Sequence, residues 1–162
     1  MKPTQGSESY EPRDPDFGSR VRASFARQRL MRTLGAEVAA VRPGVVEIEL
    51  PFRDDLTQQH GYLHAAAITA IVDSACGYAA LTLMEREVEV LTVEFKVNLL
   101  APAAGERFLA VGRVLRPGRT LTVCSGEVYA VQDASRKLIC AMQATMIASR
   151  TADSEAVYEV PS

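Results

Sequence analysis

The chain has 162 residues, of which 48% are hydrophobic and 23% are charged, so it is long enough to form one domain with a sizeable core. Its formal net charge of −2 gives no electrostatic reason to expect nucleic acid or an anionic membrane as a partner. The first residues lack the apolar run of a secretory signal, and three separately placed cysteines predict free thiols in a reducing compartment. We therefore expect a cytoplasmic protein.

No motif in the sequence predicts a metal site or a nucleotide-binding site. His60 and His64 are the two histidines of the chain, and neither lies in a metal-ligand pattern. The glycine-rich loops that bind dinucleotides or nucleoside triphosphates are absent from the sequence. We therefore expect an activity that needs no metal and no cofactor.

Residues 1–15 are rich in proline, glycine, serine and charge, which predicts a flexible N-terminal segment. Residues 16–33 have the spacing of an amphipathic helix that ends near Gly35. Its arginines predict a solvated basic face, with contact to an anionic ligand or a partner subunit as the alternative: Arg20, Arg22, Arg27, Arg29 and Arg32. The alternation in residues 36–41 and 45–51 then predicts two strands.

The chain is organised around its longest apolar stretch, residues 65–83, which follows the polar segment 58–64. Apolar residues cover every face of this predicted helix, and Asp73 is its one charge. A membrane span is the alternative, but the interruption at Asp73, the charged residues 85–87 and the lack of a second span argue against it. We therefore expect a helix enclosed by the protein itself.

Four strands are predicted after the helix, and a Pro-Gly-Arg turn at residues 117–119 joins the second to the third. Their ranges are 89–100, 107–116, 120–132 and 138–149. The predicted fold class is therefore α+β, with an antiparallel sheet curled around one long central helix and an extra N-terminal helix. Residues 16–150 form the single domain, and residues 151–162 form a C-terminal tail.

Asp73 needs a chemical explanation, because a carboxylate in a buried helix must be hydrogen-bonded, protonated or next to a cavity. The structural explanation is a bond to backbone amides, Ser74 or Thr69, and the functional one is a role in a site. His64 stands at the start of the helix, and the small residues 65–67 follow it. A helix N-terminus offers unpaired N–H groups to an oxyanion or a polarised carbonyl, which favours the functional explanation.

The motif with Gly61, His64 and an acidic residue nine positions later, Asp73, resembles that of the PaaI-type (phenylacetic acid degradation) hotdog-fold acyl-CoA thioesterases. Segments 34–51, 91–103 and 114–121 resemble further parts of that family, and the resemblance covers roughly residues 17–149. It implies the hotdog fold, a five- or six-stranded antiparallel sheet around the long helix. It also implies a homodimer with active sites at its interface, often paired into a homotetramer.

The resemblance also implies roles for individual residues. The backbone N–H of Ala65 would polarise the thioester carbonyl. Asp73 of the partner subunit would be the general base that activates water, with a nucleophilic role as the alternative. Thr92 would help to position the water, and His64 would bond near the thioester or fix the loop geometry. Gln58 stands where many relatives carry a contributing asparagine.

The same resemblance suggests residues that contact the substrate. Gly61 and Ala66 would lie beside it, and Gly118 and Arg119 would contact the CoA phosphates, although an exposed turn arginine is an equal alternative. Candidates for lining an acyl pocket are Tyr62, Tyr78 and Phe95. Ala65 and Ala66 replace the usual Gly-Gly of the family, which keeps the backbone donor but narrows the approach to it.

The leading hypothesis is hydrolysis of an aromatic or short- or medium-chain acyl-CoA to the free acid and CoA. A non-catalytic hotdog protein that binds acyl-CoA or another small ligand is the first alternative. The retained Asp73 argues against it, because a binding module has no need for a buried charge. A hotdog dehydratase or hydratase is the second alternative, but its His and Asp lie closer together in sequence than they do here.

Overall fold

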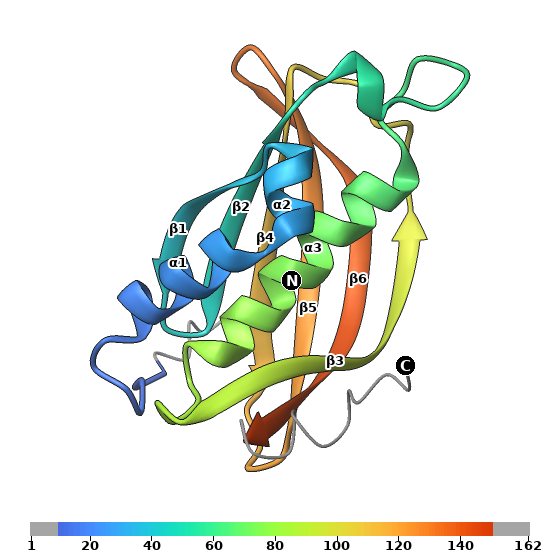
Figure 1. Cartoon of the computed structure of the whole chain (residues 1–162). Helices are drawn as coiled ribbons and strands as arrows, with labels where there is room; N and C mark the ends of the chain where they lie inside the picture. The colour runs from blue at the N-terminus through green and yellow to red at the C-terminus, as the bar shows by residue number, and fades with distance from the viewer. Residues whose placement is uncertain (1–9, 151–162) are drawn as a thin grey trace, which may run out of the picture.

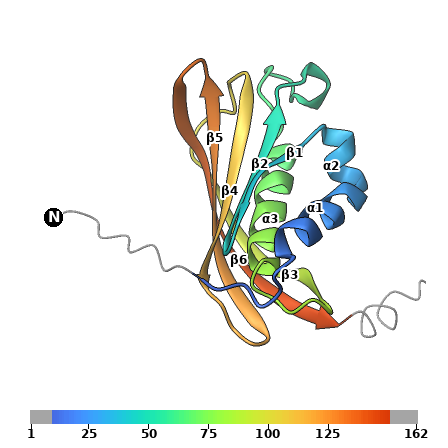
Figure 2. The ribbon, with the colours of Figure 1, turned by 90° about the vertical axis from the view of Figure 1, so that its left-hand side faces the viewer.

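The computed structural model describes residues 10–150, and its sheet and helices form three layers (Figure 2). The sheet has six antiparallel strands in the order β1-β2-β4-β5-β6-β3, with bounds β1 Glu37–Arg42, β2 Val45–Pro51, β3 Val88–Leu99, β4 Arg107–Arg116, β5 Leu121–Gln132 and β6 Ser135–Arg150. The helices are α1 Phe17–Arg27, α2 Arg29–Leu34, the short 3-10 helix Asp54–Leu56, and α3 Ala65–Leu81.

Helix α3 lies across one face of the curved sheet (Figure 1). Strand β4 turns Phe108 and Ala110 toward it, both fully buried, and Gly112 continues this alternation. A Cβ atom on Gly112 would lie 2.3 Å from the carbonyl carbon of Ala75, and one on Gly126 would lie 2.4 Å from Cγ2 of Val72. Glycine at these two positions therefore lets the helix approach the backbone of strands β4 and β5.

The outer side of α3 is partly covered by α1, which forms the third layer (Figure 2). Val21 and Phe25 of α1 are buried, and the rings of Phe25 and Tyr78 lie 5.9 Å apart at 59°. This cover explains why α3 is apolar all round. Within residues 10–150, no helix is long and apolar enough to cross a membrane. The burial of α3 between the sheet and α1 confirms the predicted enclosed helix.

The structure corrects two predicted boundaries. The single helix expected over residues 16–33 is divided at Gln28, whose extended backbone (φ −70°, ψ 108°) ends α1 and precedes α2, while Gly35 ends α2 in the left-handed conformation as predicted. The last strand begins at Ser135, not at residue 138, because a tight turn with Asp133 at φ 50° allows pairing to resume at once. Sequence spacing alone does not show either local backbone change.

Arg20 was predicted to belong to a solvated basic face, but its guanidinium group is bonded within the protein. Its guanidinium donates to the carbonyl oxygens of Leu81, Met84 and Glu85 at 2.7, 3.1 and 2.6 Å, respectively, and forms an ion pair with Asp14 at 3.3 Å. Asp14 is only 2% exposed. Of the N-terminal segment expected to be flexible, residues 10–15 therefore pack at the end of α3, whereas residues 1–9 and the predicted tail 151–162 lie outside the described residues.

Candidate active site

The N-terminus of α3 presents a backbone donor. His64 is the N-cap, and its Nδ1 accepts the N–H of Ala66 at 2.9 Å, which satisfies one of the unpaired groups of the first turn. The N–H of Ala65 has no hydrogen-bond acceptor within residues 10–150. His64 therefore occupies the amide of Ala66 and leaves that of Ala65 available.

The half-buried Ala65 borders a cavity of about 530 Å³, which we call the amide-side cavity. Its lining is mostly apolar and includes Ile68, Leu99, Leu100, Pro102 and Ile139. Tyr62 and Gln58 also line it. Gln58 and Ala65, both predicted site residues, therefore line one cavity.

The loop that carries Gln58 is held by its own hydrogen bonds. The N–H of Gln58 donates to the carbonyl of Tyr62, and the N–H of Gly61 donates to the carbonyl of Gln58, both at 2.9 Å. Gly61 has φ 80°, a backbone angle that favours glycine. The side-chain Oε1 of Gln58 accepts the N–H of His60. Gly61 therefore shapes the turn beside the cavity, and it is exposed.

Asp73 lies on α3 and contacts the edge strand β3. The Thr92 hydroxyl donates to Oδ1 of Asp73 at 2.9 Å, so these two predicted residues are brought together. The structural explanation through Ser74 does not hold, because the Ser74 hydroxyl donates to Oε1 of Gln28 at 3.3 Å. The register of β3 on β6 shifts between Thr92 and Glu94. Such a bulge re-aims side chains, and bulges are frequent beside active sites.

The carboxylate of Asp73 faces a second cavity of about 270 Å³, which we call the acid-side cavity. Helices α1 and α3 and the start of β3 line it: Ser24, Arg27, Gln28, Ser74, Gly77, Tyr78 and residues 89–92. Burial raises the pKa of Asp73, and the hydrogen bond from Thr92 partly opposes that rise. A carboxylate with a raised pKa beside a cavity is a candidate general base.

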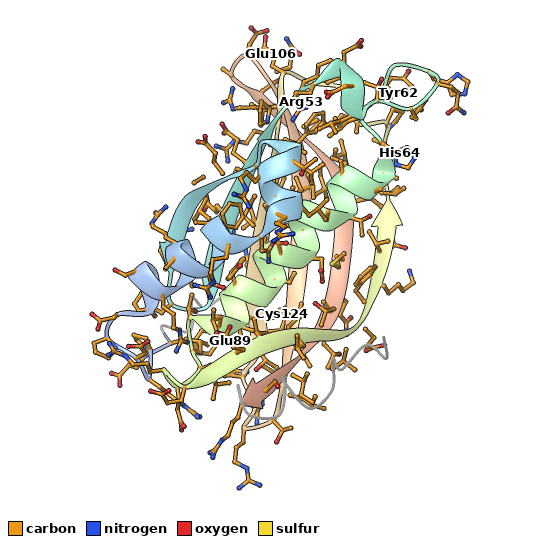
Figure 3. The ribbon with its side chains drawn as sticks, in the orientation of Figure 1. Arg53, Tyr62, His64, Glu89, Glu106 and Cys124 are labelled. Atoms are coloured by element: carbon orange, nitrogen blue, oxygen red, sulfur yellow. The ribbon has the colours of Figure 1, made fainter. Side chains whose placement is uncertain are left out.

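The two halves of the predicted site lie apart within one chain. Ala65 and Asp73 are eight residues apart on α3, a separation of about 12 Å along the helix axis. Figure 3 shows His64 at one end of this helix and Glu89, which lines the acid-side cavity, toward the other. A single chain therefore cannot place both groups on one thioester.

Gly118 and Arg119 line a third cavity, of about 580 Å³, near the C-terminal end of α3. Arg13 and Arg150 line it as well, and we call it the arginine cavity. A Cβ atom on Gly118 would lie 2.1 Å from the carbonyl oxygen of Leu121, so the turn needs glycine there, whereas Arg119 is exposed. These two residues, predicted to contact the CoA phosphates, lie near the opposite end of α3 from Ala65.

Sequence reasoning missed the contribution of α1. Ser24 and Gln28 reach the acid-side cavity only because α1 packs on the outer side of α3, and no motif signals that packing. Of the candidates for an acyl pocket, Tyr78 lines the acid-side cavity, whereas Phe95 is 44% exposed on the edge strand. Within the described residues, no cluster of three or more His, Cys, Asp or Glu side chains could hold a metal ion.

Comparison with known proteins places this chain in a family. Residues 60–136 match the family model described as the thioesterase superfamily. The solved structure of a thioesterase family protein from Silicibacter pomeroyi is 52% identical, has a TM-score of 0.81, and the match covers 83% of this chain and 98% of that one. A Saccharolobus solfataricus protein named "Putative esterase SSO2140" is 32% identical over 110 residues, 68% of this chain and 76% of its own.

The PaaI protein of E. coli, from the phenylacetic acid degradation operon, supports the fold. It is 16% identical with a TM-score of 0.72, and the match covers 82% of this chain and 92% of that one. The chain therefore belongs to the thioesterase superfamily, with the hotdog fold that its sequence predicted. Its class of activity is thioester hydrolysis.

Proposed function

We propose that the protein is an acyl-CoA thioesterase that releases CoA and a free acid from an aromatic or short- or medium-chain acyl-CoA. The observation that carries this proposal is the half-buried carboxylate of Asp73, bonded to Thr92 and open to a cavity. Thioester hydrolysis needs a base, a water and an oxyanion donor. The free N–H of Ala65 is the candidate oxyanion donor. The proposed chemistry needs no metal or cofactor.

The proposed reaction starts with the thioester carbonyl oxygen accepting a hydrogen bond from the Ala65 N–H. Ionised Asp73 removes a proton from a water whose oxygen attacks the carbonyl carbon, with Thr92 holding the carboxylate. The tetrahedral oxyanion remains bonded to the Ala65 N–H and to the positive end of the helix dipole. Its collapse breaks the C–S bond, and the CoA thiolate takes the proton from Asp73.

We propose that the active protein is a homodimer, because Ala65 and Asp73 on one thioester must come from two chains. Strand β3 is at the edge of the sheet, and an unpaired edge is a template for pairing with another chain. Its exposed apolar side chains are Leu91, Val93, Phe95 and Leu99. Joining two β3 edges would cover them and supply each site with Asp73 of the partner subunit. The family resemblance supports pairing of two dimers into a homotetramer.

The arginine cavity is our candidate for the CoA phosphates. Arg13, Arg119 and Arg150 are among the residues that line it, and arginine binds phosphate through charge-assisted hydrogen bonds. Leu81, at this end of α3, is about 12 Å from Asp73 along the helix axis, a span that an extended pantetheine arm can bridge. Substitution of Arg119 by alanine should raise KM for acyl-CoA with little change in kcat.

The test is CoA release from short, medium, long and aromatic acyl-CoAs by the wild type and by Asp73→Ala. Turnover of one class by the wild type and its loss in the variant would support the proposal and name the substrate class. Thioester binding without turnover by a folded wild type would instead support the binding-module alternative, with Ala65 and Ala66 as its cause. Hydration of a 2-enoyl-CoA would support the hydratase alternative.

We propose a cytoplasmic location, which the state of the three cysteines supports. Cys76, Cys124 and Cys140 are free and buried, and free thiols persist in reducing compartments. Burial raises the pKa of Cys76 above its usual range and that of Cys124 to about 12. These thiols are therefore unreactive core residues, and none of them competes with the attacking water as the nucleophile.

A further inference from the structure

The far end of the acid-side cavity is polar, although apolar side chains dominate the core around it. Tyr78 donates from its hydroxyl to Oγ of Ser24 at 3.3 Å, and Ser74 donates to Oε1 of Gln28 at 3.3 Å. Tyr78 is only 4% exposed, so its hydroxyl is held within the protein. Both bonds are longer than the usual range for a hydroxyl donor, and a ligand oxygen could replace either acceptor at little cost.

The depth of this cavity is set by a missing side chain. Gly77 lies four residues after Asp73, on the same face of α3, and it lines the cavity. The nearest atom to a Cβ placed on Gly77 is Cγ1 of Val90, at 4.0 Å, so a methyl group would fit there. Tyr78 follows Gly77, which places the polar end about 6 to 8 Å along the helix axis from Asp73.

From these observations we propose that the acid-side cavity receives the acyl group and that Ser24, Gln28 and Tyr78 select short acyl groups carrying a hydrogen-bonding oxygen at their far end. This inference rests on the proposed thioesterase function. The volume of about 270 Å³ is below the usual range of ligand pockets, which excludes a long acyl chain from full entry. Helix α1, which the sequence motif does not include, thus determines specificity.

The proposed selectivity depends on the free-energy cost of leaving buried polar groups without hydrogen-bond partners. An acyl group that ends in a methyl would push into the Tyr78–Ser24 pair and break its bond without replacing it. A terminal hydroxyl can accept from Tyr78 and donate to Ser24 or Oε1 of Gln28 in the same space. Sites that hydrogen-bond a substrate oxygen discriminate strongly against the analogue that lacks it. We expect the preference for the hydroxylated acyl group to be only on the order of tenfold. In the empty site the polar side chains already hydrogen-bond to one another, so part of the gain is lost on binding.

The experiment compares kcat/KM for hexanoyl-CoA and 6-hydroxyhexanoyl-CoA. The wild type should prefer the hydroxylated substrate by about tenfold, and Ser24→Ala combined with Tyr78→Phe should reduce that ratio to near one. Ser19→Ala, at an exposed position of the same helix, is the matched control and should keep the wild-type ratio.

Gly77→Ala tests the depth of the cavity independently. The added methyl should shift the preferred acyl length down, lowering kcat/KM for 6-hydroxyhexanoyl-CoA relative to acetyl-CoA by about tenfold. Alanine has a higher helix propensity than glycine, so this variant should remain folded. An unchanged length preference would overturn the assignment of the acyl group to this cavity.

A wild type that hydrolyses both six-carbon substrates equally, or a double variant that keeps the tenfold ratio, would overturn the inference while leaving the thioesterase intact. Absence of CoA release from every substrate would overturn the proposed function instead. In that case the Kd values of the two six-carbon acyl-CoAs for Asp73→Asn, measured by calorimetry, still test the selection. Equal Kd values for them would overturn the inference.

Discussion

The Thr92 hydroxyl lies 2.9 Å from Oδ1 of Asp73, and the register of its strand shifts directly after it. The shift falls between Thr92 and Glu94, and Thr92 itself pairs with Met146 on β6. Two opposing influences therefore meet at one carboxyl: burial raises its pKa and the Thr92 bond lowers it. The balance between them sets the pH at which Asp73 can act as a base.

Replacing Thr92 by valine should move the pH profile of hydrolysis. Asp73 must lose its proton to act as a base, so kcat/KM should rise with pH through a pKa above the ordinary 3.8. Without the hydroxyl, that pKa should rise further, and the acidic limb should move to higher pH. Thr92→Ser keeps a hydroxyl and should leave the limb near its wild-type position. Identical limbs in the valine and wild-type profiles would contradict the assignment of Asp73 as the titrating base.

Asp73→Asn should abolish activity and stabilise the fold at neutral pH. Loss of a general base lowers kcat by roughly 10²- to 10⁴-fold. The folded-state pKa of Asp73 is raised, so between the unfolded and folded pKa values the folded state binds more protons, and stability falls as pH rises through that window. Asparagine does not ionise and avoids this loss. Urea unfolding should show a gain for the variant at pH 7 that disappears below pH about 3.8.

Ala65→Pro should remove the oxyanion donor without unfolding the helix. Ala65 is the first residue of α3, a position where proline is favoured and its missing N–H breaks no helical bond. His64 has φ −65° and ψ 140°, angles that suit a residue before proline. We expect kcat to fall by roughly 10²- to 10³-fold with an unchanged circular dichroism spectrum. Ala65→Gly keeps the N–H and should retain activity; equal losses in both variants would contradict the backbone role.

Mixing two inactive variants should restore activity if the site spans two chains. Co-expressed Ala65→Pro and Asp73→Asn subunits would form heterodimers with one intact site and one doubly altered site. Random pairing should restore about a quarter of wild-type activity, whereas each variant alone stays inactive. Tagged subunits purified in tandem would raise that fraction to about half. Activity that stays at the level of the single variants in purified heterodimers would rule out a site shared between subunits.

Arg20→Ala should destabilise the protein although Arg20 is far from the proposed chemistry. The guanidinium satisfies three carbonyl groups at the end of α3, and its removal leaves the buried Asp14 with Arg86 at 3.5 Å as its remaining ion-pair partner. We expect a loss of about 2 to 4 kcal/mol in the free energy of unfolding, measured in urea. Arg29→Ala, at an exposed position of α2, should change it by less than about 0.5 kcal/mol.

Periodicity predicted the sheet and the enclosed helix, and motif spacing predicted the family, whereas the role of Asp73 stays a prediction. These features depend on local pattern and on a motif within one segment. The break at Gln28 and the use of Arg20 as a helix cap could not be predicted. Both depend on tertiary contacts, with Ser74 for Gln28 and with Leu81 and the residues after it for Arg20. The polar end of the acid-side cavity could not be predicted for the same reason, because Ser24 reaches the cavity only through tertiary packing.

Gly112 and Gly126 have a consequence for how loss-of-function variants in this protein should be interpreted. Neither residue lines a cavity with Asp73, yet both contact α3 at residues 72–76, and a single methyl group at either position would collide with them. Such a methyl would lift the middle of the helix and carry the carboxylate away from Thr92. A genetic screen for activity would therefore recover inactivating changes on the sheet, behind the helix, in a protein whose Asp73 and Thr92 are unchanged.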